Sequence, residues 1–321
     1  MTERQLKILK EDYFYITGIV RAKTVDKPSI AIKLGVSWPT VKKKVASLLN
    51  EGIIINEGDS YKINPDILDT SLFIGIYSDG ISINCIALNL AQETVELSEV
   101  ISKENYDSFV AIIHNTNLSL LSKITFLVHH FSQEDKILNI GISIQGTITL
   151  SGDVIISNSH LSLNSSSFPD KCTLFEAVRA NYYMLKADYL LDDMWYLYVG
   201  NEAIYLLSNG TISPSKGLIS LDTCEKKAIG TLFEHNTDPI SLFEAKDIVL
   251  QKIIPFMHFV HPSVLIVGGA LASQEVSSFV YSDFKALNIS EVKFDDSNFT
   301  KSIACFAMSK FFKGREWYHS Q

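Results

Sequence analysis

The chain has 321 residues, of which 46% are apolar and 20% charged, a composition that indicates two or three folded domains and excludes a disordered chain. No apolar run approaches the roughly 18 residues of a membrane span, and the N-terminal residues are polar, so we expect a cytoplasmic protein without membrane contact. Residues 1–66 carry 11 Lys/Arg and 8 Asp/Glu (+3) and the rest carry 17 and 28 (−11), which fits a DNA-contacting head on an acidic body.

The first expected element is an amphipathic helix. Its apolar positions are three and four residues apart, which is the spacing of one helical face, and they are Leu6, Leu9, Tyr13, Ile16 and Val20.

The next segment, 29–50, is typical of a helix-turn-helix. Ser29 is placed to cap a short helix that ends near Leu34, and Gly35 supplies a tight turn. Ser37 caps a second helix, and Pro39 lies in its first turn, where a missing N–H costs nothing. This helix has a basic face and an apolar face, the latter formed by Val41, Val45, Leu48 and Leu49.

A strand, a glycine turn and a second strand are expected at 51–56 and 57–64, as in the wing of a winged helix. The alternative is an ordinary helical hairpin with a lysine-rich solvated face, which accounts for neither the wing nor the preceding helix. We therefore predict a winged helix-turn-helix DNA-binding domain at 1–66. Its expected DNA contacts are Ser37, Trp38, Thr40, Lys42, Lys43 and Lys44. Because the positive excess of one copy is small, we expect two copies on one operator.

After a short connector at 64–70 the pattern becomes that of an α/β domain. Strands are expected at 72–77, 81–88, 94–100 and 137–144, a helix over 106–131, and a hairpin around 151–152. A similar order then recurs, with strands at 195–200, 202–207 and 264–270 and helices at 223–233, 241–258 and 301–312. Two similar halves, 71–180 and 181–321, predict a duplicated fold with a cleft between them.

Four features in this order resemble the ROK family of repressors and sugar kinases. They are the winged helix, Gly-Ile-Tyr-Ser-Asp-Gly at 75–80, Gly-Ile-Ser-Ile-Gln-Gly at 141–146, and His-Pro-Ser-Val-Leu-Ile-Val-Gly-Gly-Ala at 261–270. The last is similar to the family's (Asp/His)-Pro-x-x-Ile-x-x-Gly-Gly run. The resemblance covers nearly the whole chain. It implies an α/β architecture in which a winged helix-turn-helix precedes a duplicated actin-like (ribonuclease-H-like) ATPase-type fold.

The resemblance also implies that the body has lost its catalytic groups. Where the family's kinases have Asp-x-Gly-Gly-Thr, this chain has Tyr77, Ser78, Asp79, Gly80 and Ile81. Their catalytic acid belongs to an Asn-Asp-Ala-Asn run, and three registers of the matching segment place there Val178, Ala180 or Asn181. None of these can act as a general base. The alternative acids flank the segment at Glu176 and Asp188. We therefore predict no enzymatic activity and no cofactor.

The family's zinc site is reduced as well. Of its cysteine loop, the segment 216–225 keeps only Cys224-Glu225, and one thiol cannot make a tetrahedral site, so no metal is expected. The four cysteines are too widely spaced for a disulfide framework and are expected to be buried thiols: Cys85, Cys172, Cys224 and Cys305. The polar residues expected near the cleft, able to hold sugar hydroxyl groups, are Gln145, Asn158, His160 and Asn181. The alternative is that they are loop and helix-cap residues without a ligand role.

Three functions remain open. The first, which we predict, is a DNA-binding transcriptional regulator, a repressor of carbohydrate-related genes, with an inactive sugar-kinase-like body. Its partners would be a double-stranded operator, a sugar or sugar-derivative effector, and a second copy in a homodimer (or dimer of dimers) formed through 241–258 and 279–284. The second is an active ATP-dependent sugar kinase with an appended head. The third is a DNA-binding dimer with no effector.

Overall fold

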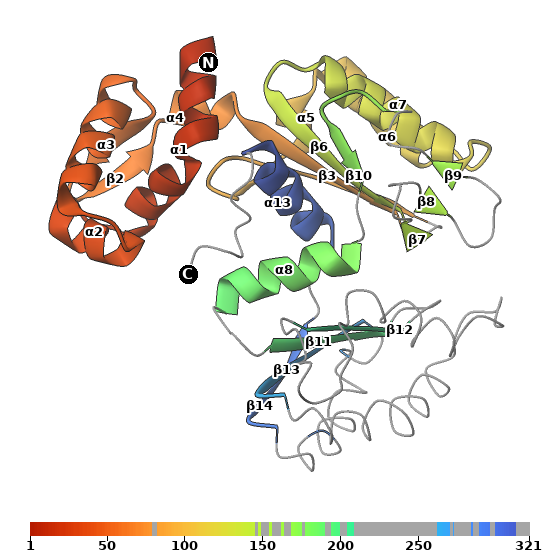
Figure 1. Cartoon of the computed structure of the whole chain (residues 1–321). Coiled ribbons are helices and arrows are strands. Elements are labelled where there is room, and N and C mark those ends of the chain that lie inside the picture. The colour runs from red at the N-terminus through yellow and green to blue at the C-terminus, as the bar shows by residue number, and fades with distance from the viewer. Residues whose placement is uncertain are drawn as a thin grey trace. The chain divides into compact units, whose positions relative to one another are not determined.

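The structure is a computed structural model of the chain (Figure 1). It describes residues 1–78, 82–144, 147–148, 154–155, 162–163, 168–174, 177–189, 194–199, 204–208, 262–269, 272, 284, 289–295 and 299–312. The chain forms two compact units, of which the first combines Met1–Ala177 with Thr300–Gln321 and the second is Val178–Phe299. The predicted division was 1–66, 71–180 and 181–321. The observed division differs from the predicted one in two respects. The N-terminal segment and the first α/β half form a single unit, and the C-terminal helix belongs to that unit as well.

The N-terminal segment contains three helices and a hairpin, in the order expected from the sequence. The helices are α1 (Glu3–Arg21), α2 (Lys27–Leu34) and α3 (Trp38–Asn50), and the strands β1 (Ile54–Glu57) and β2 (Ser60–Ile63) pair antiparallel. One expectation was wrong: α2 is capped by Asp26, whose carboxylate accepts the N–H of Ser29, so Ser29 lies inside the helix. Gly35 ends α2 with a φ of 63°, as the glycine turn requires.

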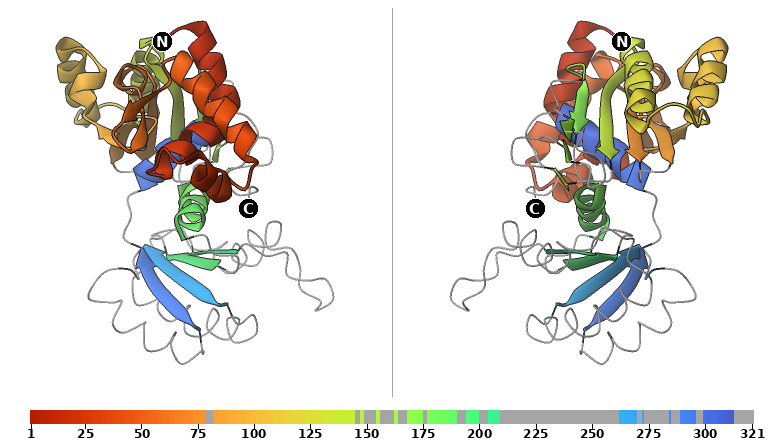
Figure 2. Two further views of the ribbon diagram at one scale, coloured as in Figure 1. Left: turned by 90° about the vertical axis from the view of Figure 1, so that its left-hand side faces the viewer. Right: turned by 90° about the vertical axis from the view of Figure 1, so that its right-hand side faces the viewer.

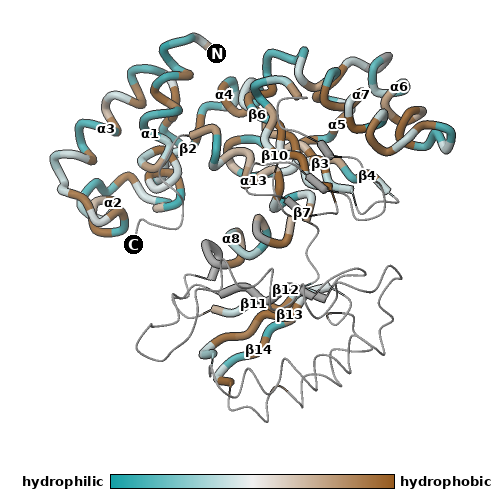
Figure 3. Tube along the Cα trace, turned by 45° about the vertical axis from the view of Figure 1, so that its right-hand side comes forward, coloured by the Kyte–Doolittle hydropathy of each residue, from teal (hydrophilic) through white to brown (hydrophobic). Residues whose placement is uncertain are grey.

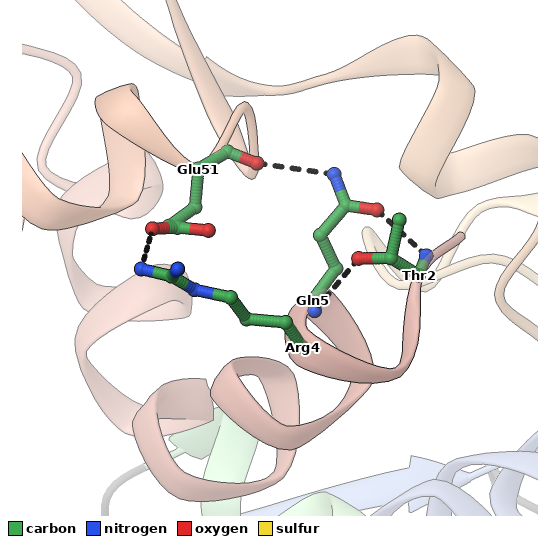
Figure 4. A network of polar contacts seen from close by, with 4 residues as sticks. All are labelled: Thr2, Arg4, Gln5 and Glu51. Carbon is green, nitrogen blue, oxygen red and sulfur yellow. Dashed lines mark hydrogen bonds and ion pairs between the residues drawn. The ribbon is translucent and has the colours of Figure 1, made fainter.

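Polar contacts fasten the start of α1 to the end of α3 (Figure 4). Thr2 and Gln5 form a reciprocal capping box, with the N–H of Gln5 3.2 Å from the Thr2 hydroxyl and the N–H of Thr2 2.9 Å from Oε1 of Gln5. The Gln5 amide also donates to the carbonyl of Glu51 at 3.0 Å, and Arg4 forms an ion pair with the Glu51 carboxylate. These contacts fix the C-terminal end of α3 against α1.

The sheet of the first unit has the order β10-β6-β3-β4-β5. Its strands are β3 (Leu72–Ser78), β4 (Ile83–Leu88), β5 (Thr94–Val95), β6 (Ile137–Ile144) and β10 (Cys172–Leu174). β3 pairs parallel with β6 and antiparallel with β4, and β6 pairs parallel with β10. The short element α5 (Leu97–Val100) occupies the end of the segment in which a strand was expected.

Two helices, rather than the single helix expected over 106–131, cover one face of this sheet: α6 (Lys103–Ile113) and α7 (Leu120–Gln133) (Figure 1). The expectation failed because polar residues between them form local hydrogen bonds. The Asn115 side chain accepts the N–H of Asn117 at 2.9 Å, and Ser119 caps the new helix by accepting the N–H of Ser122 at 3.1 Å.

The opposite face of the same sheet is covered by α13 (Phe299–Phe311), which also lies beside the N-terminal helices (Figure 2). Alternate residues of β3 point to the two faces, so Ile74 packs toward α6 and α7, and Phe73 toward α13. Gly75 permits the close approach of α13, since a Cβ there would lie 2.3 Å from the carbonyl oxygen of Thr300 and 2.9 Å from the N–H nitrogen of Ala304.

The N-terminal segment and the first unit's sheet share one apolar core. Tyr13 of α1 stacks on Phe312 with ring centroids 3.9 Å apart, and its hydroxyl lies 2.9 Å from the sulfur of Met308. The predicted connector is the short helix α4 (Pro65–Asp69), and its Ile67 is buried in this core. The N-terminal segment is therefore packed onto the body, not merely linked to it.

The second unit contains α8 (Ala177–Tyr189, with Val178 onward in this unit) and a sheet of order β12-β11-β13-β14. The strands are β11 (Met194–Val199), β12 (Ile204–Ser208), β13 (Val264–Gly269) and β14 (Glu291–Asp295). β13 is predominantly apolar (Figure 3) and pairs parallel with β11 and β14. The antiparallel β11–β12 pair beside it repeats the order of β4, β3 and β6, as the predicted duplication requires.

A small three-stranded antiparallel sheet joins β7 (Thr147–Ile148), β8 (Val154–Ile155) and β9 (Ser162–Leu163), and β7 and β8 form the predicted hairpin. The helices predicted at 223–233 and 241–258 lie outside the described residues. Among the helices that the structure describes, none is long and apolar enough to cross a membrane.

Candidate functional sites

The exposed face of α3 is basic and aromatic. Lys42 and Lys43 are exposed, and Trp38, at the first position of the helix, keeps 45% of its surface exposed. The ammonium group of Lys42 lies 5.3 Å from the centroid of the Trp38 ring, one helical turn away, as a cation–π pair. Residues 27–50 contain five lysines and no Asp or Glu, so no carboxylate of α2 or α3 weakens this positive charge.

Two of the predicted DNA contacts have local hydrogen-bond partners. Ser37 is the N-cap of α3, and its hydroxyl lies 3.4 Å from the N–H of Thr40 and 2.7 Å from the Thr40 hydroxyl. The two hydroxyl groups therefore hold the first turn of α3 together. The contact of these two residues with DNA stays a prediction. Both side chains already form hydrogen bonds within the first turn of α3.

Lys44, also predicted to contact DNA, is partly buried, with 32% of its side chain exposed. Its ammonium group forms an ion pair with the buried Asp12 of α1 and lies 5.2 Å from the ring centroid of Tyr15. This pair ties α3 to α1, and the contact of Lys44 with DNA stays a prediction. Asp12 was missed by the sequence analysis, although a carboxylate three residues after Leu9 and four before Ile16 signals a polar group on the buried face.

The end of β3 is where the resemblance implied the loss of phosphate-binding groups. Tyr77, at the position of the family's leading acid, is half-buried between Asn84 of β4 and Ser143 of β6 in the sheet register. The Ser78 hydroxyl is buried and donates to the carbonyl of Ser82 at 2.7 Å. Asp79, Gly80 and Ile81 lie outside the described residues.

A buried polar triad occupies the second unit. Asn181 of α8 has no exposed surface, and its amide donates to the Tyr196 hydroxyl at 2.9 Å and to the Asp295 carboxylate at 2.6 Å. The Tyr196 hydroxyl also donates to Asp295, at 3.1 Å. Burial first, and then the charge of Asp295, raises the pKa of Tyr196 well above 10, so this hydroxyl remains a neutral donor.

The triad changes the interpretation of Asn181, which was predicted to contact a ligand. Its amide joins α8 to β11 and β14, and its complete burial keeps it from a solvent-borne sugar, so we remove it from the ligand set. Gly268 of β13 belongs to the same packing, because a Cβ there would lie 2.5 Å from the Tyr196 hydroxyl. Tyr196 and Asp295 had no recognisable signal in the sequence, since their strands are apart in the chain.

The structure describes only some of the remaining predicted site residues. Val178 and Ala180, the other registers for the catalytic acid, are buried in α8, whereas Glu176 and the side chain of Asp188 lie outside the described residues. The same is true of the predicted ligand residues Gln145, Asn158 and His160, and of Cys224. The part of the chain that the structure describes contains no cluster of three His, Cys, Asp or Glu able to hold a metal ion.

The candidate dimer segment 279–284 is described only at Phe284, which has no exposed surface. Complete burial makes this residue unsuited to the interface contact expected of it. The segment 241–258 lies outside the described residues.

No protein-family model matches the chain, and no curated protein matches it in sequence. A solved structure described as a ROK family transcriptional regulator, a homologue of the E. coli MLC protein, has a TM-score of 0.54 and 11% identity and covers 94% of this chain and 97% of that chain. Two solved structures are more distant. A glucokinase from Balamuthia mandrillaris in complex with glucose has a TM-score of 0.40, 8% identity and coverage of 74% and 93%. Component A of (R)-2-hydroxyglutaryl-CoA dehydratase from Acidaminococcus fermentans has a TM-score of 0.38 and 11% identity, and the match covers 76% of this chain and 100% of that chain. The chain therefore shares its overall α/β fold with a ROK family transcriptional regulator, along nearly the whole length of both.

Proposed function

We propose that the chain is a DNA-binding transcriptional regulator whose head, residues 1–66, is a winged helix-turn-helix. The observation that carries this proposal is the exposed basic face of α3, with Lys42 and Lys43 in a stretch that contains no acidic residue. A short helix, a glycine turn and a basic second helix are the parts that place side chains in the major groove. The wing strands β1 and β2 follow in the expected order.

The fold similarity supports the same proposal. The match with the regulator of similar fold leaves 6% of this chain uncovered, which is about 19 of 321 residues. The head is longer than this, at 66 residues. Coverage of this extent supports the proposal that the head, too, resembles that of the regulator. Because the sequence resembles the ROK family of repressors and sugar kinases, we propose that the chain acts as a repressor of carbohydrate-related genes.

We propose further that the actin-like body is a sensor without kinase activity. Phosphoryl transfer needs a metal-binding acid and a carboxylate that takes the proton of the sugar hydroxyl. Tyr77 stands in place of the first, and the three registers for the second give the buried residues Val178, Ala180 and Asn181. Purified protein should therefore release no sugar-dependent ADP across a sugar panel. Release above background would revive the sugar-kinase alternative, with Asp79 or Glu176 as the acid to replace first.

DNA binding is tested by selecting duplexes from a random pool with the full chain and measuring their affinity by fluorescence anisotropy. A homodimer should select two copies of a half-site related by two-fold symmetry, because the symmetry of the protein is imposed on its site. Failure to enrich any sequence would contradict the proposal. Thermal shift with sugars, sugar phosphates and glycosides then separates a regulator with an effector from a DNA-binding dimer without one.

A further inference from the structure

Before its last residue, α3 lacks the amide and carboxylate side chains that read adenine and cytosine. Asn or Gln makes paired hydrogen bonds to adenine, Asp or Glu accepts from cytosine, and Arg or Lys binds guanine. No Arg, Asn, Gln, Asp or Glu occurs in α3 before its last residue, Asn50. The Thr40 hydroxyl lies against Ser37, and the Lys42 ammonium lies over the Trp38 ring.

Apolar groups remain on this surface. Trp38 is 45% exposed and Pro39 beside it is exposed, while the apolar face of α3 is buried through Val41, Val45 and Leu48. Single exposed apolar residues need no explanation. Here, however, Trp38 lies in the stretch 27–50, which contains five lysines and no Asp or Glu. Ile32 of α2, which is 82% exposed, lies in the same stretch. Charge complementarity favours the phosphates of DNA as the neighbour of this surface over an acidic or neutral protein patch.

The wing is unsuited to supply the missing base contacts. Its tip carries two exposed carboxylates, Glu57 and Asp59, on either side of Gly58, and Lys62 of β2 forms an ion pair with Glu57. Carboxylates at the tip are repelled by the negative potential of the minor groove. Sequence discrimination therefore falls to α3.

We propose that the head discriminates bases by apolar contact between Trp38 and the C5-methyl group of thymine in the major groove. The proposal rests on the proposed DNA-binding function and specifies how its site reads sequence. The C5-methyl group is the one apolar feature that any base pair presents in the major groove. The first residues of a recognition helix are those that reach the base edges, and Trp38 is the first residue of α3. Lys42, held over the ring, adds positive charge at the same place.

The test replaces each thymine of a selected duplex with deoxyuridine, which keeps every hydrogen-bonding group and loses only the methyl group. At one or more positions of each half-site the wild-type chain should bind about fourfold more weakly, since burying one methyl group contributes about 0.8 kcal/mol. Deoxy-5-bromouridine, whose bromine occupies the place of the methyl group, should restore the affinity. Trp38→Ala should bind the thymine and deoxyuridine duplexes equally, whereas Trp38→Phe should still distinguish them.

The control variant is Ile55→Ala, since Ile55 is a similarly exposed apolar residue of the wing strand β1, and it should keep the deoxyuridine effect. If deoxyuridine is tolerated at every position by the wild-type chain, the methyl-reading proposal is wrong although DNA binding stands. The same holds if Trp38→Ala keeps the wild-type sensitivity, which would assign the contact to another residue. If no duplex is enriched at all, the proposed DNA-binding function itself is wrong.

Discussion

Replacing Phe312 by Ala should destabilise the head and the first unit's sheet together. The Phe312 side chain is 6% exposed, stacks on Tyr13 of α1 at 3.9 Å, and lies 5.6 Å from Phe73 of β3. Truncating a buried Phe costs about 3–5 kcal/mol, and we expect about 3 kcal/mol because Phe312 lies at the end of α13 and the site can partly relax. Since 1.4 kcal/mol is a factor of ten, amides that exchange by unfolding of this unit should exchange roughly a hundredfold faster.

The assay is hydrogen–deuterium exchange followed by mass spectrometry on the full chain. Peptides from α3 and from β6 should accelerate by the same factor, although Phe312 belongs to neither, because the head and the sheet share one core. Val110→Ala is the control, since Val110 is 37% exposed on α6, and it should leave α3 unchanged. Acceleration confined to α13 and β3, with α3 at its wild-type rate, would refute the shared core and make the head an independent domain.

Four further predictions concern single interactions. Lys44→Ala should lower stability by about 1–3 kcal/mol in urea unfolding, because it leaves the buried Asp12 without its ion pair, whereas Lys43→Ala should leave the unfolding midpoint unchanged. Asn181→Ala should cost about 1–3 kcal/mol by removing the donor to Tyr196 and Asp295, and an unchanged melting temperature would show that the triad contributes nothing. The pKa values of Tyr13 and Tyr196 are both raised by burial, so their neutral forms favour the folded state. Their contribution to stability should be constant below about pH 10 and fall above it, and 295 nm absorbance should show that these two phenols ionise only on unfolding. Asp59→Asn should not weaken operator binding in anisotropy titrations, and a loss of affinity would mean that the wing carboxylate makes a favourable contact.

Local pattern was sufficient for much of the fold. The glycine turn at Gly35, the cap at Ser37 and the strand β3 depend on neighbouring residues, and the sequence predicted all three. The helix expected over 106–131 failed because Asn115 and Ser119 satisfy backbone groups locally, and short polar side chains compete with the helix in this way. The spacing of apolar residues does not reveal this competition for backbone hydrogen bonds.

Contacts between distant segments could not be predicted in the same way. The predicted connector at 64–70 carries Ile67 into a core that also receives Phe312, and nothing near either residue in the sequence indicates the other. The partners of Lys44 and Asn181 could not be predicted for the same reason. Their partners, Asp12 in one case and Tyr196 and Asp295 in the other, are brought to them only by the packing of separate elements.

The most direct test of the central claim is the salt dependence of operator binding by the wild-type chain and by the Lys42→Ala/Lys43→Ala double variant. Each lysine that neutralises a phosphate contributes about 0.9 to the slope of log K against log salt concentration. Lys7→Ala is the matched control, since Lys7 is exposed on α1 and pairs with Glu11 of the same helix. We expect sequence-selective binding by the wild-type chain, a slope shallower by about 1–2 in the double variant, and a wild-type slope in the control. The account is contradicted if the double variant keeps both the affinity and the slope of the wild-type chain.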